Sequence, residues 1–216
     1  MEHHDTIDNL NELNKVTEIK ERINEWTETF LQSNITKTQP GSISWILHGE
    51  QPSEQSINIK FGRCGEFMAK EMVKMNAALE LLPCGIQQIN GRNKDVDLIF
   101  KNNETNTIHY FELKGNILLD TEKLPATIEK CEAIECHLRE KYPDHIIECG
   151  ILNWSIYNRR ILTSGLANIK AFEKKIKVIH IEEFLKLVDM TWDEADYYTY
   201  FRIIGNKVRP HAINNF

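Results

Sequence analysis

The sequence contains no apolar run approaching the ~20 residues needed to cross a bilayer. Its first residues, MEHHDTIDNLNELNK, are acidic and polar, which is not the pattern of a secretory signal. Internal repeats and low-complexity segments are lacking as well. We therefore expect a soluble, cytoplasmic protein that folds as one domain over residues 1–216.

Cysteine is scarce, and its spacing excludes two common roles. There are five cysteines and no CxxC pair. An odd number argues against a disulfide framework, and the missing CxxC spacing argues against a structural zinc site. We expect buried, reduced thiols at all five positions. These positions are Cys64, Cys84, Cys131, Cys136 and Cys149.

Basic residues are fewer than acidic ones, with 26 Lys and Arg residues, 32 Asp and Glu residues and a net charge of −6. This balance disfavours a nucleic-acid partner, because phosphate binding relies on Lys and Arg. Net charge is an average, however. A cleft that gathers several acids around a metal lowers the total without removing a basic rim. The charge balance therefore leaves nucleic-acid binding open.

What remains is the composition of an ordinary globular protein, with 41% hydrophobic and 27% charged residues. Hydrophobic periodicity predicts helices and strands in a clear order. The expected helices are 5–33, 62–82, 121–141 and 182–188. The expected strands are 85–90, 95–100, 107–115, 145–154 and 177–181. This order predicts an α/β (α+β mixed) fold, with a central mixed sheet flanked by helices and an added N-terminal helical region over 1–35.

One strand end, YFELKGN at residues 110–116, carries an acid and a base among apolar residues. Glu112 and Lys114 are two positions apart and therefore share a face of the strand. On the preceding strand, Asp95 and Asp97 share a face in the same way. A hairpin turn centred near residues 104–105 places Asp97 opposite Glu112 and Asp95 opposite Lys114. Two carboxylates and one lysine are thus predicted to converge.

Two carboxylates so close together repel each other unless a cation lies between them. Mg²⁺ takes oxygen ligands and keeps positions for water and phosphate, and we expect Mn²⁺ to substitute for it. A neighbouring lysine can orient a metal-bound water and stabilise charge that develops on a phosphate. The alternative is a plain cross-strand ion pair on the surface of a helical scaffold, worth about 1 kcal/mol or less.

Asp97, followed after fourteen residues by Glu112-Leu113-Lys114 in hydrophobic strands, resembles the PD-(D/E)xK nuclease superfamily. The order helix, three strands, helix, strand over residues 62–154 is similar to the αβββαβ core of that superfamily. Val96 stands where many members have proline before the first acid. Within the superfamily, a chain of this size with its own N-terminal helices looks most like a type II restriction endonuclease.

The resemblance implies that Asp97 and Glu112 bind Mg²⁺ and that Lys114 positions the attacking water. Asp95 is the rival for the place of Asp97. Glu66, on the helix before the strands, matches an acid that supports the metal or its waters, with a solvated helix acid as the alternative. The implied activity is hydrolysis of double-stranded DNA at a specific, palindromic site, leaving 5′-phosphate and 3′-hydroxyl ends.

A palindromic target implies a homodimer, because a two-fold DNA site mirrors a two-fold protein. The N-terminal amphipathic helix is either its interface or packed on its own core. We expect DNA contacts from polar and basic residues that follow the site strand, from the loop within 155–216 and from the C-terminus, or else these form solvated surfaces. The candidates are Asn116, Thr121, Lys123, Arg159, Arg160, Thr163, Ser164, Lys207 and Arg209.

Two other functions remain compatible with the sequence. The first is a DNA repair or junction-resolving nuclease of the same superfamily. The second is a non-catalytic DNA- or protein-binding module that keeps the fold. The pair of opposed acids disfavours this second function, because an inert module has no physical reason to hold them.

Overall fold

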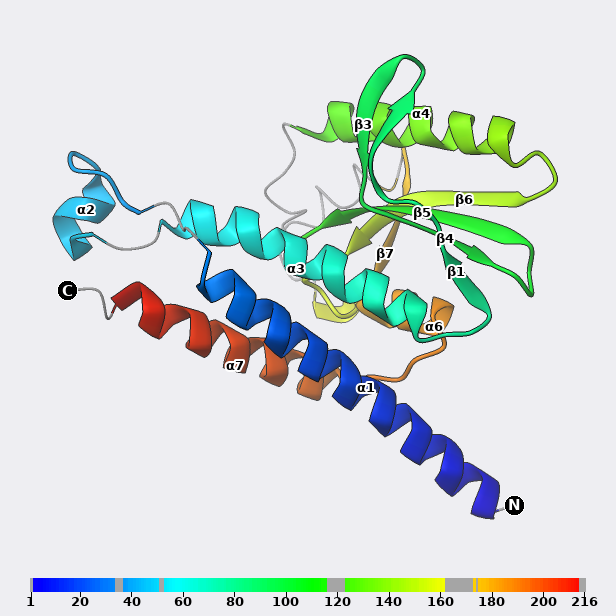
Figure 1. The fold of residues 1–216 in the computed structure, drawn as a ribbon, viewed down its shortest axis with the longest axis horizontal. Coiled ribbons are helices and arrows are strands. Elements are labelled where there is room, and N and C mark those ends of the chain that lie inside the picture. The colour runs from blue at the N-terminus through cyan, green and yellow to red at the C-terminus, as the bar shows by residue number, and fades with distance from the viewer. Residues whose placement is uncertain are drawn as a thin grey trace. The chain divides into compact units, whose positions relative to one another are not determined.

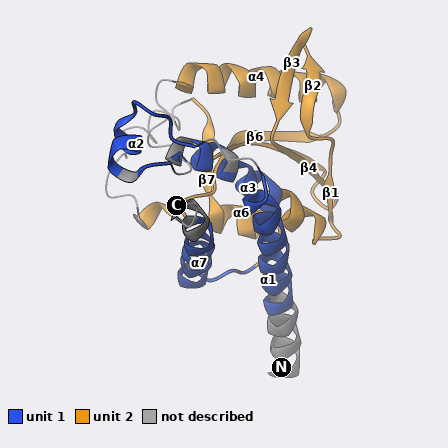
Figure 2. Ribbon diagram, turned by 60° about the vertical axis from the view of Figure 1, so that its left-hand side comes forward, with its two compact units in different colours: residues 1–68, 191–216 blue, residues 69–190 orange. Residues whose placement is uncertain are grey.

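The computed structural model describes residues 2–33, 37–50, 53–115, 123–161, 173 and 175–213. The chain forms two compact units, one of residues 1–68 with 191–216 and one of residues 69–190 (Figure 2). The boundary between them lies inside one helix. The single nuclease domain, with a catalytic core over 62–154, therefore stays a prediction, and each unit is described by itself.

Helices build the first unit (Figure 1). They are α1 (Glu2–Leu31), α2 (Ile43–His48), the first part of α3 (Glu54–Lys74) and α7 (Glu194–Ile213). The apolar stripe of α1 is buried as its three- and four-residue spacing predicts, with Val16, Ile19 and Ile23 each at most 6% exposed. The helix predicted at the N-terminus is therefore confirmed.

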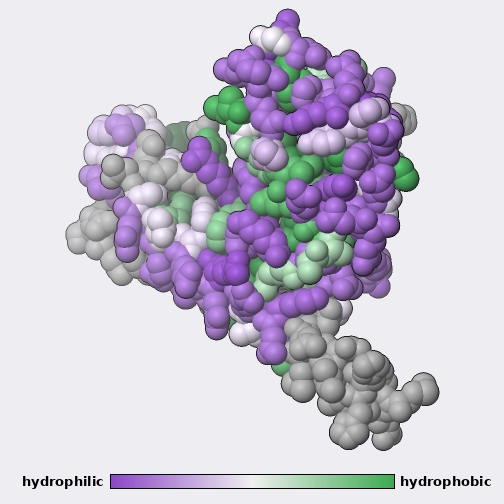
Figure 3. All heavy atoms as spheres, turned by 45° about the vertical axis from the view of Figure 1, so that its right-hand side comes forward, coloured by the Kyte–Doolittle hydropathy of each residue, from purple (hydrophilic) through white to green (hydrophobic). Residues whose placement is uncertain are grey.

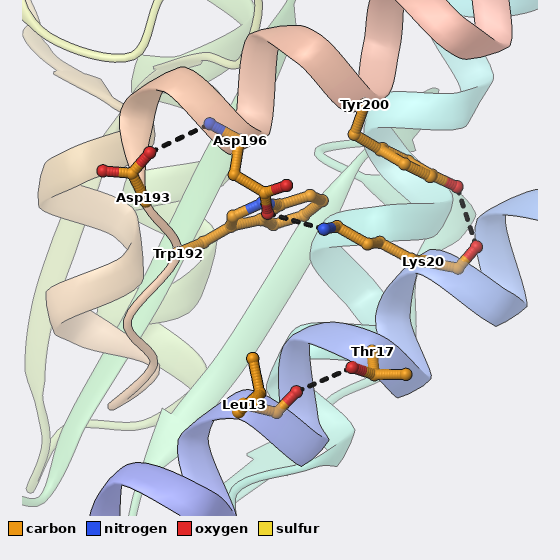
Figure 4. A network of polar contacts seen from close by, with 7 residues as sticks. All are labelled: Leu13, Thr17, Lys20, Trp192, Asp193, Asp196 and Tyr200. Carbon is orange, nitrogen blue, oxygen red and sulfur yellow. Dashed lines mark hydrogen bonds and ion pairs between the residues drawn. The ribbon is translucent and has the colours of Figure 1, made fainter.

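A polar network joins α1 to α7 within this unit (Figure 4). The Lys20 ammonium lies 2.5 Å from Oδ2 of Asp196, which also accepts a hydrogen bond of 2.8 Å from Nε1 of Trp192. The Tyr200 hydroxyl donates to the carbonyl oxygen of Lys20 at 2.7 Å. Lys20 also lies 5.6 Å from the Trp192 ring centroid, a cation–π distance. Helices α1 and α7 are thus joined by an ion pair, a hydrogen bond and a cation–π contact.

The second unit contains a five-stranded mixed sheet in the spatial order β1-β4-β5-β6-β7. The β1–β4 and β4–β5 pairs are antiparallel, and the β5–β6 and β6–β7 pairs are parallel. The central mixed sheet flanked by helices is therefore confirmed. The strands are β1 (Leu79–Leu81), β4 (Leu98–Asn102), β5 (Thr107–Lys114), β6 (Ile146–Asn153) and β7 (Lys177–His180).

The hairpin register matches the prediction, but the predicted strand over 95–100 is two strands. Leu98 pairs with Phe111, which is the expected offset of the β4–β5 hairpin. Upstream, β3 (Arg92–Val96) leaves this sheet and pairs with β2 (Gly85–Ile89). Asp95 is exposed and lies opposite Ile86. The expected pairing of Asp95 with Lys114 is wrong, because the chain changes partner strand at Asp97.

Helices α4 (Leu124–Lys141) and α6 (Ile181–Leu187) cover opposite faces of the sheet (Figure 1). Ile134 and Cys131 of α4 pack on the face that carries Tyr110, in one buried apolar cluster. Phe184 of α6 lies edge-on to Phe111, whose side chain points to the other face of the same strand. The α4 face therefore also receives Glu112 and Lys114.

The second predicted helix is displaced along the sequence. It was expected over 62–82 and lies over Glu54–Lys74, while Leu79–Leu81 forms an edge strand. Asn76 accounts for the change, since its Oδ1 accepts a hydrogen bond from the backbone N–H of Ala78 at 2.9 Å and its Nδ2 donates to the Val188 carbonyl at 3.1 Å. This local turn ends the helical run, and pairing with β4 outweighs the helical spacing of the leucines.

All five cysteines are free. Cys64 and Cys131 are buried as predicted, and burial raises the pKa of each thiol to about 12, so both stay protonated. Cys136 is exposed, which contradicts the prediction for that position. It lies on the outer side of α4, where the buried positions are Thr127, Cys131, Ile134 and Leu138.

Polar side chains cover most of the molecular face drawn in Figure 3, and apolar residues show between them. Exposed single hydrophobic residues are normal for a folded surface. Across the part of the chain that the structure describes, no helix combines the length and apolar character needed to span a membrane.

Candidate active site

Three of the predicted residues meet at the carboxyl end of β5. Glu112 and Lys114 lie on the α4 side of the strand, and Asp97 stands just before the first residue of the neighbouring β4. Their side chains are shielded from solvent, with exposed fractions of 7% for Glu112, 12% for Asp97 and 19% for Lys114. The structure therefore places two acids and a lysine in one half-enclosed spot.

A second lysine, which the sequence interpretation missed, lies between the two acids. The Lys130 ammonium, from α4, is 3.3 Å from Oδ1 of Asp97 and also pairs with Oε2 of Glu112. Burial by itself lowers the pKa of Lys130. The negative charges of Glu112 and Asp97 outweigh that effect and raise it overall, so Lys130 stays protonated. One cation thus bridges both carboxylates.

The remaining carboxylate oxygens are also held in place. Oε1 of Glu112 lies 3.3 Å from the Lys114 ammonium, and the Tyr110 hydroxyl donates to Oε2 at 3.0 Å. Oδ2 of Asp97 accepts a hydrogen bond of 2.8 Å from the backbone N–H of Leu113. Burial, and then the Glu112 charge, raise the pKa of Tyr110, so the phenol remains a donor. Both carboxylates are therefore oriented before any ligand arrives.

The signal for Lys130 was present in the sequence. The buried stripe of α4 runs through Thr127, Cys131, Ile134 and Leu138. Lys130 follows Thr127 by three positions and precedes Ile134 by four, so it lies on the same side of the helix. A charged residue on a buried stripe requires a partner of opposite charge, and the two acids of the predicted site were candidates for that partner.

The donor set fits a hard divalent cation in charge and in ligand type. Asp97 and Glu112 each direct an oxygen at one positively charged atom, the Lys130 ammonium. Mg²⁺ is commonly held by one or two carboxylates, with water and substrate phosphate as its other ligands. Among the described residues no group of three or more His, Cys, Asp or Glu side chains is placed to hold a metal. A cation bound to Asp97 and Glu112 would compete with Lys130 for the same oxygens.

Glu66, the fourth predicted catalytic residue, is half-buried on α3 and belongs to the first unit. The Asp97 site belongs to the second unit. The supporting role of Glu66 therefore remains a prediction.

The residues predicted to contact DNA lie in different environments, and their contact with DNA stays a prediction. Arg160 is exposed in the short helix η3 (Arg159–Ile161), and Lys123 is exposed at the start of α4. Arg159 is engaged within the protein, because its Nη2 donates to the Val178 carbonyl at 3.1 Å and lies 2.5 Å from Glu173. Four candidates lie outside the described residues, namely Asn116, Thr121, Thr163 and Ser164.

The last two candidates belong to α7 in the first unit. Lys207 is exposed and donates a hydrogen bond of 3.1 Å to Oδ1 of Asn24. Arg209 lies one turn before the end of α7, and its side chain is outside the described residues. Their contact with DNA stays a prediction.

Two buried polar residues continue the row of Lys114 across the sheet. Asn153 on β6 is in register with Lys114, and His180 on β7 is in register with Asn153. Both side chains are fully buried. Ser155 donates to Oδ1 of Asn153, whose Nδ2 has no hydrogen-bond partner among the described residues. Sequence reasoning missed these residues because they end otherwise apolar strands.

Buried histidines predict that stability falls in mild acid. Burial lowers the pKa of both His109 and His180, and nearby acids only partly counter this. The unfolded chain, with a histidine pKa of about 6.5, therefore takes up protons at a higher pH than the folded chain. The contribution of the two histidines to the free energy of unfolding should be constant above about pH 7. It should fall below about pH 6.5, by up to ~1.4 kcal/mol per pH unit for each histidine.

Urea denaturation at a series of pH values measures this slope. His109→Gln and His180→Gln should each reduce it. His137→Gln is the control, because that side chain is half-exposed on α4 and the change should leave the slope as it is. An identical slope in all four proteins would contradict the prediction.

A scan against models of protein families found no match, and a search of curated proteins also found none.

Proposed function

We propose that the protein is a Mg²⁺-dependent endonuclease with a restriction-endonuclease-like core, which hydrolyses double-stranded DNA at a specific site as a homodimer. The observation that supports this most is the convergence of Asp97 and Glu112 on one cationic atom, with Lys114 on the same face. A surface ion pair needs one acid and one base. It does not explain a second acid and a second lysine at the same enclosed spot.

In this proposal Asp97 and Glu112 hold the metal, which when bound supplies a Lewis acid that lowers the pKa of water and offsets phosphate charge. Tyr110 and the Leu113 N–H keep the two carboxylates in orientation, through hydrogen bonds of 3.0 and 2.8 Å. Lys114 orients the attacking water and donates to a phosphate oxygen as negative charge develops there. Lys130 offers a second ammonium, which pairs with Oε2 of Glu112 and Oδ1 of Asp97.

Replacing Lys114 with alanine tests the proposal. Phage and plasmid DNA incubated with the wild-type protein and Mg²⁺ should give discrete fragments. Lys114→Ala should lower the cleavage rate about 100- to 1,000-fold, because it removes a donor to the developing charge. The control is Lys186→Ala, which removes an exposed lysine on α6 and should cleave like the wild type.

Lys186→Ala should melt at a temperature close to that of the wild type. Lys114→Ala removes a partner of the shielded Glu112, so its melting temperature should fall, and cleavage is compared at a temperature where both variants are folded. Wild-type protein that leaves varied DNA intact with both Mg²⁺ and Mn²⁺ would refute the endonuclease. Cutting that depends on DNA structure and not on sequence would favour a repair or junction-resolving nuclease instead.

One observation favours a second candidate, a non-catalytic DNA-binding module. Lys114 and Lys130 already pair with the carboxylates, so both acids have a cationic partner within the protein. Calorimetric titration with Mg²⁺ separates the two functions. Heat of binding that disappears in Glu112→Gln supports the endonuclease, and the absence of any binding, with or without DNA, supports the module.

A further inference from the structure

The hairpin of β2 and β3 forms a two-stranded ribbon separate from the five-stranded sheet. Its turn residues, Asn90 and Gly91, both have positive φ, at 50° and 74°. Asn-Gly with two positive φ values is the preferred two-residue hairpin turn, because it matches the twist of the strands. The ribbon stands beside α4, with its turn pointing away from the sheet (Figure 1). It is therefore a well-formed projection and not an irregular loop.

The two faces of the ribbon differ sharply. Ile89 and Val96 lie on one face and are buried in the same apolar cluster as Cys131 and Ile134 of α4. This packing fixes the ribbon to the unit that contains the site. The other face carries two cross-strand pairs, Ile86 with Asp95 and Gln88 with Asn93, and all four residues are exposed.

The exposed face presents the groups that recognise base edges. Nε2 of Gln88 donates to Oδ1 of Asn93 at 2.5 Å, which leaves an amide acceptor and an amide donor side by side. Asn and Gln bind adenine through such an acceptor and donor, Asp accepts from cytosine, and apolar side chains contact the thymine methyl group. Ile86 is 75% exposed and gives this face an apolar side chain beside the amides.

The ribbon also has the position for a DNA groove. Its charges are divided between the two faces, and Asp95 lies on the exposed face. Arg92 and Lys94 share the face of Val96, where Arg92 lies 3.8 Å from Glu129 of α4. Val96 ends β3, and the next residue is Asp97 of the site. At ~3.3 Å per residue, Asn93 lies roughly 13 Å along the strand from Asp97. That length corresponds to about four base pairs, and the major groove, about 12 Å wide, admits a two-stranded ribbon.

We propose that the β2–β3 ribbon enters the major groove of duplex DNA and that Gln88 and Asn93 read base edges within about four base pairs of the cleaved phosphate. This proposal rests on the proposed endonuclease and names its specificity element. The direct attachment of the ribbon to Asp97 would fix the distance between the bases that are read and the bond that is cut.

The double variant Gln88→Ala/Asn93→Ala tests the ribbon. Wild-type and variant proteins cleave the same phage DNA in Mg²⁺, and sequencing of the fragment ends gives the preferred site of each. The rate ratio between that site and a duplex with one changed base should fall about 5- to 150-fold in the variant. Melting temperature and Mg²⁺ affinity should stay unchanged, because both side chains are exposed and outside the site.

Gln87→Ala is the matched control. Gln87 precedes Gln88, lies on the opposite face of the ribbon and donates to the Pro83 carbonyl at 2.5 Å. Its loss should leave the preferred site unchanged. An equal loss of discrimination in the control would show that ribbon folding, and not base contact, was affected, and would overturn the assignment of Gln88 and Asn93.

Failure of the ribbon proposal can be told apart from failure of the endonuclease. A double variant that cuts the same site with the same discrimination overturns the ribbon and leaves the endonuclease standing. A change of molecular mass in solution with unchanged discrimination would show that the exposed face binds a second copy, which also overturns it. If the wild type cuts no DNA, the ribbon can still be tested by selecting the duplexes that each protein binds from a random pool. If the wild type and the double variant enrich the same sequences equally, Gln88 and Asn93 do not read bases.

Discussion

Replacing Lys130 with methionine is expected to lower the free energy of unfolding by about 3–5 kcal/mol at pH 7, the cost of breaking a buried ion pair from one side. Methionine keeps the unbranched apolar part of the side chain and removes the charged ammonium. Asp97 and Glu112 would then lose the ammonium that pairs with both of them, and Lys114 would still pair with Glu112. Urea denaturation measures the loss. Lys141→Met, an exposed lysine at the end of the same helix, should change stability by less than about 1 kcal/mol.

Two further measurements show whether charge is the cause. Lys130→Met/Glu112→Gln should recover much of the lost stability, because it removes one of the two repelling carboxylates. Mg²⁺ should stabilise Lys130→Met more than it stabilises the wild type, since a cation that occupies the site no longer competes with an ammonium. If Lys130→Met is as stable as the wild type, the charges of Asp97 and Glu112 do not repel each other in the folded protein.

The hairpin at the centre of the sheet could be predicted because two independent signals agreed. The alternation of apolar and polar residues predicts that Glu112 and Lys114 share one face of the strand. The position of the polar turn predicts the register of the hairpin, in which Leu98 pairs with Phe111. The break at Asp97 could not be predicted in this way. Alternation continues unchanged through 95–100, so nothing local shows that the upstream half pairs with β2 and the downstream half with β5. The strand with which each half of this segment pairs is decided by tertiary packing, which the local sequence does not show.

The two acids and the first lysine of the site could be predicted, and the second lysine could not. Asp97, Glu112 and Lys114 belong to one pair of neighbouring strands, so a sequence motif reveals them. Lys130 comes from a helix packed over that pair, and its relation to the acids depends on how α4 lies on the sheet. Asn153 and His180 were missed for a similar reason, since only the parallel register of β5, β6 and β7 brings them into one row with Lys114.

Replacing Gly150 with alanine is expected to destabilise the second unit by about 1–3 kcal/mol, the usual cost of overpacking a well-filled core. A Cβ at Gly150 would lie 2.8 Å from the carbonyl oxygen of Lys177 and 3.3 Å from a ring carbon of Phe111. The first contact is with the backbone of β7 at Lys177, which pairs with Gly150 of β6. The β7 backbone can therefore move away only by disturbing the hydrogen bonds between β6 and β7.

A second glycine, Gly62 in α3, provides a control of opposite sign. A Cβ there meets no atom within 4 Å, and alanine is a better helix former than glycine by about 1 kcal/mol. Gly62→Ala should therefore raise the free energy of unfolding by roughly 0.5–1 kcal/mol, because it reduces the entropy of the unfolded chain. Urea denaturation of both variants measures the two effects. If Gly150→Ala also stabilises the protein, β6 and β7 do not approach each other as closely as their register at Gly150 and Lys177 requires.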